Sequence, residues 1–247
     1  MQTRWHFSDS DSTWLAAALA FVARAEREAL TARGAFHIVL AGGNTPRLVY
    51  ESLAQEHHDW AHWQVWFGDE RCLPVEHPER NSVMARALLE RITAALPPMP
   101  KGGSIHTIPG ELGPVKAASA YAAELADVGD FDLVILGLGE DGHTASLFPC
   151  HTPCHTPCHT PGYLPKPEAD ALAVFDAPKP PPERVSLSAG RLSRARQVLF
   201  LVSGLGKSEA LRRWRAGDPT IPAATIQPEA GVDVLLAPDL STPGVLP

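Results

Sequence analysis

The chain has 247 residues, 45% of them hydrophobic and 20% charged, with 21 Lys and Arg against 28 Asp and Glu for a net charge of −7. This composition excludes collagen-like, disordered and disulfide-rich small-protein classes. The negative balance argues against nucleic-acid and anionic-membrane partners, because it supplies no diffuse positive field. The length favours one α/β domain, and we expect 1–247 to form a single domain.

The first predicted elements are a helix and a strand. Apolar residues recur at helical spacing over 12–33, with Ser12 as a candidate N-cap. A continuous apolar run at 36–41 predicts a strand buried on both faces. It ends in GGNTP, at 42–46, after which a helical pattern resumes. A strand, a glycine turn and a helix make half of a parallel βαβ unit.

The same order recurs along the chain. A short strand at 64–67 leads into Gly-Asp-Glu-Arg at 68–71, and Asn81 is a candidate N-cap for the next helix. Further helices are expected near 114–127 and 205–216. The remaining expected strands are 131–138, 172–175, 185–187, 198–202 and 232–236. This alternation predicts a three-layer α/β fold with a mostly parallel sheet between helices.

Nothing in the sequence indicates export or a membrane. No run approaches the roughly 20 apolar residues that span a bilayer. The first twelve residues lack the basic and then apolar order of a secretory signal. Three of the four cysteines lie in one short repeat, so a disulfide framework is not expected. We therefore expect a cytoplasmic protein.

Candidate functional residues follow three of the predicted parallel strands. The carboxyl ends of such strands meet at one edge of the sheet, where function gathers. In the first turn, backbone N–H groups of Gly42, Gly43, Asn44 and Thr45 at a helix start offer a site for an anion, and we take these residues as substrate-binding. The alternative is a purely structural turn with Thr45 as the N-cap.

The second turn carries Asp69 and Arg71. A guanidinium stays charged at any relevant pH, so Arg71 is suited to stabilise an oxyanion or to hold a substrate oxygen. We count Asp69 among the substrate-binding candidates. The alternative is a loop arginine that is ion-paired with Asp69 or Glu70.

The third turn, at 139–144, contains His143. A neutral imidazole can accept a proton from water, and a carboxylate on its other nitrogen can orient the ring. Asp141 and Glu140 both stand close enough in sequence to do this; we count Asp141 among the catalytic candidates, and the choice between the two stays open. The alternative is a structural histidine in a cap. Three candidate sites on one edge favour the catalytic interpretation.

Two further cations, Arg184 and Lys207, also stand beside strand ends. Singly, each is typical of a solvated surface residue. Together with a helix N-terminus they indicate a clamp for a phosphate group.

A tandem Cys-His-Thr-Pro repeat occupies 150–161 within a proline-rich loop at 149–167. Thiolates and imidazoles are zinc ligands. However, a proline at every fourth residue prevents a helix from presenting them on one face. We interpret the repeat as a loop expansion, and we expect no metal and no cofactor.

Taken together, these segments resemble the 6-phosphogluconolactonases of the glucosamine-6-phosphate deaminase/6-phosphogluconolactonase family. The matching segments are 40–54, 66–89, 131–149 and 184–207, and GDERCLP with GLGEDGHTASLFP is the most specific pair of motifs. The resemblance implies an αβα fold similar to that of glucosamine-6-phosphate deaminases and ribose-5-phosphate isomerases. It also implies hydrolysis of 6-phospho-D-glucono-1,5-lactone in the oxidative pentose phosphate pathway. The Cys-His-Thr-Pro repeat departs from the family pattern, which has a shorter loop there.

The same resemblance implies roles for individual residues. His143 is implied to be the catalytic base and Arg71 to contact the lactone or its oxyanion. The residues implied to surround the phosphate are Gly43, Asn44, Thr45, Arg184 and Lys207. The partner expected is thus a phosphorylated sugar lactone, and we expect a monomer or a weak homodimer.

Two other functions are weighed against this one. Amino-sugar phosphate deaminase/isomerases share GDGH but carry an acid where Phe148 stands and an aromatic residue in place of Arg71. A non-catalytic sugar-phosphate sensor would need a DNA-binding module, and 12–33 is a single helix without a partner before the first strand.

Overall fold

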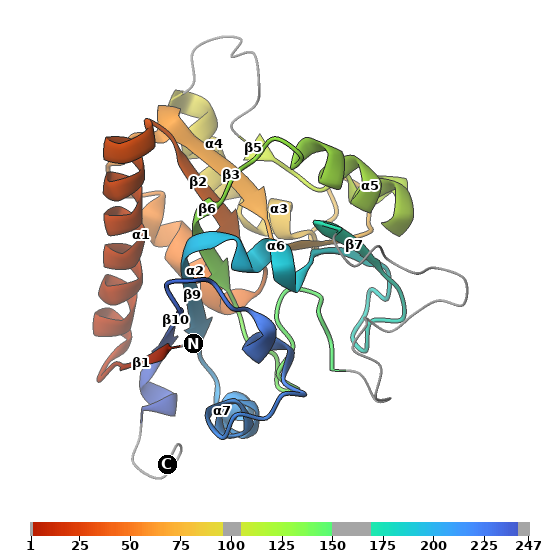
Figure 1. Cartoon of the computed structure of the whole chain (residues 1–247). Coiled ribbons are helices and arrows are strands. Elements are labelled where there is room, and N and C mark those ends of the chain that lie inside the picture. The colour runs from red at the N-terminus through yellow and green to blue at the C-terminus, as the bar shows by residue number, and fades with distance from the viewer. Residues whose placement is uncertain (1, 96–104, 150–168, 242–247) are drawn as a thin grey trace.

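Two β-sheets organise residues 2–95, 105–149 and 169–241, the part of the chain that the computed structural model describes (Figure 1). The larger sheet has seven strands in the order β1-β10-β9-β6-β2-β3-β5, and all neighbouring strands in it are parallel. The smaller sheet has three antiparallel strands in the order β4-β8-β7. The strands are β1 (Thr3–Phe7), β2 (Phe36–Leu40), β3 (Trp63–Phe67), β4 (Asp69–Arg71), β5 (Ile105–His106), β6 (Phe131–Leu136), β7 (Ala171–Val174), β8 (Arg184–Leu187), β9 (Ala195–Val202) and β10 (Val232–Leu236).

Helices cover the larger sheet on both faces (Figure 1). Helices α1, α2 and α4 pack together on one face, while α5, α6 and the smaller sheet cover the other. This is the three-layer α/β architecture that the alternating pattern predicts, and the fold prediction is confirmed. The helices are α1 (Asp11–Arg33), α2 (Asn44–Leu53), α3 (Asn81–Met84), α4 (Arg86–Ala95), α5 (Pro114–Glu124), α6 (Ala189–Ser193) and α7 (Ser208–Arg215), with 3₁₀ turns η1 (Trp60–His62), η2 (Gly110–Leu112), η3 (Leu205–Lys207), η4 (Pro222–Thr225) and η5 (Pro238–Leu240).

The central strands are apolar along their whole length because layers cover them on both sides. All six residues of β6 are buried, and so are all but one of the residues in β2 and in β3. In the register of the sheet, Ile38 of β2 lies between Val65 of β3 and Leu133 of β6. A continuous apolar run is the sequence pattern of such a doubly covered parallel strand.

The N-cap of helix α1 lies two residues before the one expected from the sequence. Ser10, not Ser12, is the N-cap: its hydroxyl accepts from the backbone N–H of Thr13, and the Thr13 hydroxyl accepts from the Ser10 N–H. These reciprocal bonds satisfy two N–H groups that the helix start leaves unpaired. The helix ends at Gly34, whose φ of 74° is in the left-handed region that favours glycine.

The expected strands at 172–175 and 185–187 do not join the larger sheet. They form β7 and β8, which pair with each other as antiparallel neighbours, and β8 pairs in turn with β4. The sequence shows that these residues are extended but not which strand they pair with. Strand β1 was not predicted, because its Arg4 and His6 interrupt any apolar run; both bind Asp233 of β10.

The chain order of the strands opens a crevice at one place in the larger sheet. From β2 the chain continues to β3 on one side, whereas β6, the neighbour of β2 on the other side, continues to β9 and β10. The loops that follow β2 and β6 therefore run apart. In open α/β sheets, ligands bind in the crevice outside the carboxyl ends of such a pair of strands.

None of the helices in the described residues is both long and apolar enough to cross a membrane. The Cys-His-Thr-Pro repeat at 150–161, and the rest of the proline-rich loop from 150 to 167, lie outside the described residues.

Candidate active site

A cavity of about 410 Å³ lies at this crevice. The turn after β2, the start of β4, the loop after β6, the segment between β7 and β8, and the end of β9 all contribute to its wall. Of the ten residues that the sequence analysis takes as catalytic or substrate-binding, all but Asp141 line this cavity. Those that line it are Gly42, Gly43, Asn44, Thr45, Asp69, Arg71, His143, Arg184 and Lys207.

The turn after β2 places the N-terminus of α2 against the cavity. Gly43 is the N-cap of α2 with a φ of 103°, and no side chain caps the helix there. Thr45 is therefore not the N-cap, and its hydroxyl instead lies 2.7 Å from that of Ser203 at the end of β9. Without a side-chain cap, the first N–H groups of α2 remain available to an anion.

Gly42 is required by a close approach. A Cβ atom on Gly42 would lie 2.0 Å from Oδ1 of Asn81. Asn81 is buried and donates through Nδ2 to Asp69, 2.8 Å from its carbonyl and 3.0 Å from its carboxylate. Asn81 is the first residue of α3 and not its N-cap; that position belongs to Arg80. The side-chain amide of Asn81 thus packs against Gly42 in the turn after β2 and is hydrogen-bonded to Asp69 in β4.

Arg71 and Arg184 stand opposite each other in the β4–β8 register. The Arg71 guanidinium donates to the Glu79 carbonyl, and in the part of the chain that the structure describes it forms no ion pair with Asp69 or Glu70. Glu70 is completely buried and accepts instead from the backbone N–H groups of Arg71 and Asn81. The alternative of an arginine neutralised by its own loop does not describe Arg71.

His143 and Asp141, in the described part of the loop after β6, form a pair with the geometry of a base and its orienting group. Nδ1 of His143 lies 2.5 Å from Oδ1 of Asp141, which also accepts from the backbone N–H of His143 at 3.1 Å. Burial works to raise the pKa of Asp141, but these bonds and the nearby imidazole outweigh it and lower the pKa to about 2. An ionised Asp141 favours the tautomer with the proton on Nδ1.

The loop around His143 is tightly packed. A Cβ atom on Gly139 would lie 2.0 Å from Nδ1 of His143 and 2.6 Å from Oδ1 of Asp141. The ring of Phe148 lies 4.7 Å from the imidazole, centroid to centroid. The hydroxyl of Thr144 donates to the Gly137 carbonyl, which closes the loop at its base. These contacts hold the imidazole in one place at the wall of the cavity.

Arg184 is a nearly buried cation in this wall. Its guanidinium donates to the carbonyls of Pro181 and Lys179, at 3.1 and 2.7 Å, and lies 5.6 Å from the centre of the Phe148 ring. Burial lowers the pKa of Arg184, and the neighbouring Asp69 opposes that shift. A desolvated guanidinium interacts strongly with an anion that enters such a site.

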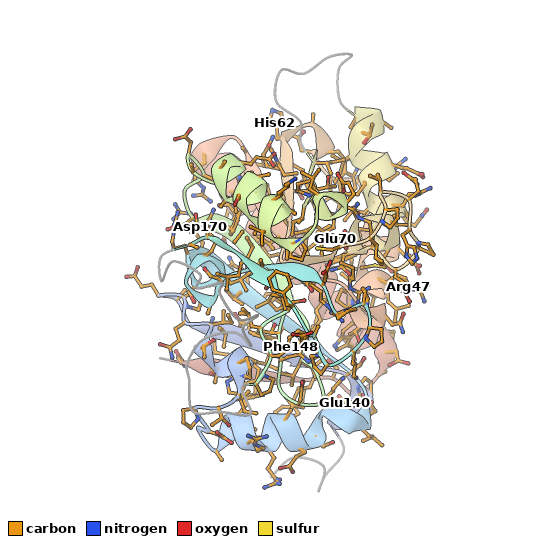
Figure 2. All side chains as sticks on the ribbon, turned by 90° about the vertical axis from the view of Figure 1, so that its right-hand side faces the viewer. Arg47, His62, Glu70, Glu140, Phe148 and Asp170 are labelled. Atoms are coloured by element: carbon orange, nitrogen blue, oxygen red, sulfur yellow. The ribbon has the colours of Figure 1, made fainter. Side chains whose placement is uncertain are left out.

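Lys207, the last residue of η3, also lines the cavity. Burial lowers the pKa of its amine, while Glu140, 3.9 Å from Nζ, works to raise it. Glu140 also lies 3.8 Å from Nζ of Lys179. It makes no contact with the imidazole among the hydrogen bonds and ion pairs of the described residues, so Asp141 is the carboxylate that contacts His143. Figure 2 shows Glu140 and Phe148 on the same side of the molecule, in its lower half.

Sequence reasoning missed several residues at this site. Lys179 lines the cavity but lies outside the matching segments, so no motif indicated it. Phe148 also lines the cavity, and the sequence analysis named it only as the position where deaminase/isomerases carry an acid. The buried Asn81 and Ser146 both contact Asp69. The sequence analysis named Asn81 only as a candidate N-cap and did not name Ser146. No group of three or more His, Cys, Asp or Glu side chains within the described ranges is arranged to hold a metal ion.

Comparison with protein families gives one match that spans most of the chain. The family of glucosamine-6-phosphate isomerases and 6-phosphogluconolactonase matches residues 9–235. The 6-phosphogluconolactonase of Synechocystis is 37% identical to this chain over 221 residues, which cover 85% of each protein. The 6-phosphogluconolactonase of Homo sapiens is 35% identical over 239 residues, covering 91% of this chain and 86% of the human protein.

Solved structures show the same fold. The crystal structure of a 6-phosphogluconolactonase from Thermotoga maritima superposes with a TM-score of 0.80. The superposition covers 96% of this chain and 100% of the other, at 24% sequence identity. At that identity the similarity demonstrates the fold alone.

Proposed function

The chain belongs to the family of glucosamine-6-phosphate isomerases and 6-phosphogluconolactonases, and we propose that it hydrolyses 6-phospho-D-glucono-1,5-lactone to 6-phosphogluconate with His143 as the general base. It is an enzyme of the lactone-hydrolase type, as its relatives are. One observation carries the mechanism. An oriented imidazole and a set of cations beside a helix N-terminus line the same cavity.

In this proposal, the groups around the N-terminus of α2 bind the phosphate. The N–H groups that begin at Asn44, the Lys207 ammonium and the Arg184 guanidinium all favour a dianionic phosphate ester. A cavity of about 410 Å³ is large enough for a sugar phosphate. With the phosphate held at one end, the C1 carbonyl is presented toward His143, and this positioning removes part of the activation barrier.

Hydrolysis then needs a proton acceptor and an oxyanion stabiliser. Nε2 of His143 takes a proton from water as the water oxygen bonds to C1, and Asp141 stabilises the imidazolium that forms. The carbonyl oxygen becomes an oxyanion that Arg71 stabilises. When the C1–O5 bond breaks, the imidazolium returns the proton to O5, which gives the open-chain acid. General base catalysis contributes roughly 10²–10⁴-fold, and one oxyanion donor about 10²–10³-fold.

The decisive experiment is a dehydrogenase-coupled or pH-stat assay on freshly generated 6-phosphogluconolactone, corrected for spontaneous ring opening. Turnover above that background supports the proposal. Binding of 6-phosphogluconate without turnover would instead indicate a sugar-phosphate sensor.

The deaminase/isomerase alternative is disfavoured by Phe148. This side chain lies beside His143 in the cavity wall and offers no proton for ring opening or for transfer between C1 and C2. Release of ammonia from glucosamine 6-phosphate would revive that alternative.

We also propose that the enzyme acts in the cytoplasm, as a monomer or a weak homodimer. Light scattering coupled to size-exclusion chromatography, over a range of protein concentrations, tests the oligomeric state.

A further inference from the structure

Glu140 occupies a position between two lysines of the cavity. Its Oε1 lies 3.9 Å from Nζ of Lys207 and its Oε2 lies 3.8 Å from Nζ of Lys179. The two lysines come from different parts of the fold, since Lys207 ends η3 and Lys179 lies between β7 and β8. One carboxylate therefore connects two lysines of the cavity lining.

The Glu140 side chain also lies against the backbone of Gly206. A Cβ atom on Gly206 would lie 3.1 Å from Oε1 of Glu140 and 3.4 Å from its Cδ and Cγ. The side chain thus rests on the peptide of the residue that precedes Lys207. A side chain at position 206 would require the Glu140 carboxylate to move by a few tenths of an ångström.

The two neighbouring carboxylates, Asp141 and Asp69, are hydrogen-bonded to other residues and do not pair with these lysines among the described residues. Asp141 is bonded to His143, and Asp69 is bonded to Ser146 and Asn81. Glu140 does not line the cavity itself, and its side chain is 60% exposed. Its contacts with Lys179 and Lys207 are the ion pairs that it forms among the described residues.

From this arrangement we infer that Glu140 limits the anion affinity of the phosphate site: its carboxylate competes with the incoming anion for the Lys179 and Lys207 ammonium groups. The inference rests on the proposed function, because it takes these lysines as phosphate-facing. A dianionic phosphate ester carries more charge than the carboxylate and can displace it from the lysines.

Removing the charge of Glu140 tests this inference through the affinity for inorganic phosphate, measured by titration calorimetry at low ionic strength. We expect Glu140→Gln to bind inorganic phosphate roughly three- to tenfold more tightly than the unaltered chain, because a negative charge near the anion is lost. Acetate, a monoanion, should gain affinity by a smaller factor, because the repulsion that the substitution removes scales with the charge of the ligand. Screening should reduce the difference to less than about twofold at 0.5 M salt, where the Debye length is only a few ångströms.

Two variants serve as controls. Glu140→Asp keeps the charge and should retain the unaltered preference for phosphate over acetate. Glu28→Gln removes one exposed negative charge from α1, away from the cavity lining, and should leave phosphate affinity unchanged.

Unchanged phosphate affinity in Glu140→Gln would overturn the inference, and so would weaker affinity, which would mean that Glu140 positions the lysines instead. Phosphate binding requires no turnover. The phosphate titration is therefore independent of the lactone assay. If the unaltered chain does not hydrolyse the lactone but Glu140→Gln binds phosphate more tightly, the proposed function is overturned and the role of Glu140 stands.

Discussion

The Ser146 hydroxyl donates a 2.6 Å hydrogen bond to Oδ2 of Asp69. Both groups are buried, and the bond crosses from the loop after β6 to β4. The loop carries His143 and β4 carries Arg71, so this bond fixes the proposed base relative to the proposed oxyanion-binding group. Asp69 thereby has a structural task in addition to any contact with substrate.

Ser146→Ala should therefore affect both stability and turnover. A buried carboxylate oxygen that loses its donor costs about 1–3 kcal/mol. We expect the free energy of unfolding to fall by that amount in urea titrations, and kcat to fall more than KM rises. Ser82→Ala is the matched control, because the Ser82 hydroxyl donates at 2.8 Å to Glu70, a buried carboxylate outside the cavity lining. An equal kinetic loss in both variants would contradict the role of the Ser146 bond.

His143→Ala should lower kcat by roughly 10²–10⁴-fold, since the water loses its proton acceptor. Binding of 6-phosphogluconate, measured by calorimetry, should persist because the phosphate-facing groups remain. The control is His62→Ala, which removes an exposed imidazole with a similar 2.8 Å contact to Asp59. Turnover near the unaltered rate in a folded His143→Ala protein would exclude this residue as the base.

Asp141→Asn tests the orienting carboxylate in two ways. The variant should lose at least about tenfold in kcat, because an amide does not stabilise the imidazolium or the reactive tautomer as a carboxylate does. Its pH dependence of stability should also change. The pKa of Asp141 is lowered in the folded chain from 3.8 to about 2, so its ionised form stabilises the fold above pH 3.8 and that contribution is lost as the pH falls through 2.

Thermal unfolding between pH 5 and pH 2 measures that contribution. The unaltered protein should lose more stability over this interval than Asp141→Asn does. Parallel curves for the two proteins would mean that the pKa of Asp141 is the same in the folded and unfolded states.

Gly139→Ala should displace the proposed base without removing it. The new Cβ atom would lie 2.0 Å from Nδ1 of His143, so the imidazole must move. We expect kcat to fall by at least about tenfold, since small misplacements of reacting groups are costly. Gly129→Ala is the control: a Cβ atom there meets nothing within 4 Å. Full activity in a folded Gly139→Ala enzyme would show that the position of His143 is not critical.

Lys207→Ala and Arg184→Ala should mainly raise KM for the phosphorylated lactone. Each removes a cation from the proposed phosphate site, whereas the groups that act at C1 remain. Kinetics with unphosphorylated glucono-1,5-lactone provide the comparison, because its KM should change little. Lys116→Ala, at an exposed position on α5, controls for the loss of one positive charge. Unaltered product affinity in both cavity variants would remove them from the phosphate site.

The sequence by itself determined the layered fold and the edge at which function gathers. Doubly covered parallel strands need continuous apolar runs, and their carboxyl ends meet at one edge by geometry, so 36–41, 64–67 and 131–138 could be placed without coordinates. The residue types of the motifs then indicated an anion site, a guanidinium and an imidazole.

Only the tertiary structure decided which groups meet. Periodicity identifies an extended segment but not its partner, so it could not separate β7 and β8 from the larger sheet or place Arg184 opposite Arg71. It also could not choose between Asp141 and Glu140, which are adjacent in sequence. Their side chains leave the loop in different directions, one to His143 and the other to the lysines, because the path of the backbone and its packing set those directions.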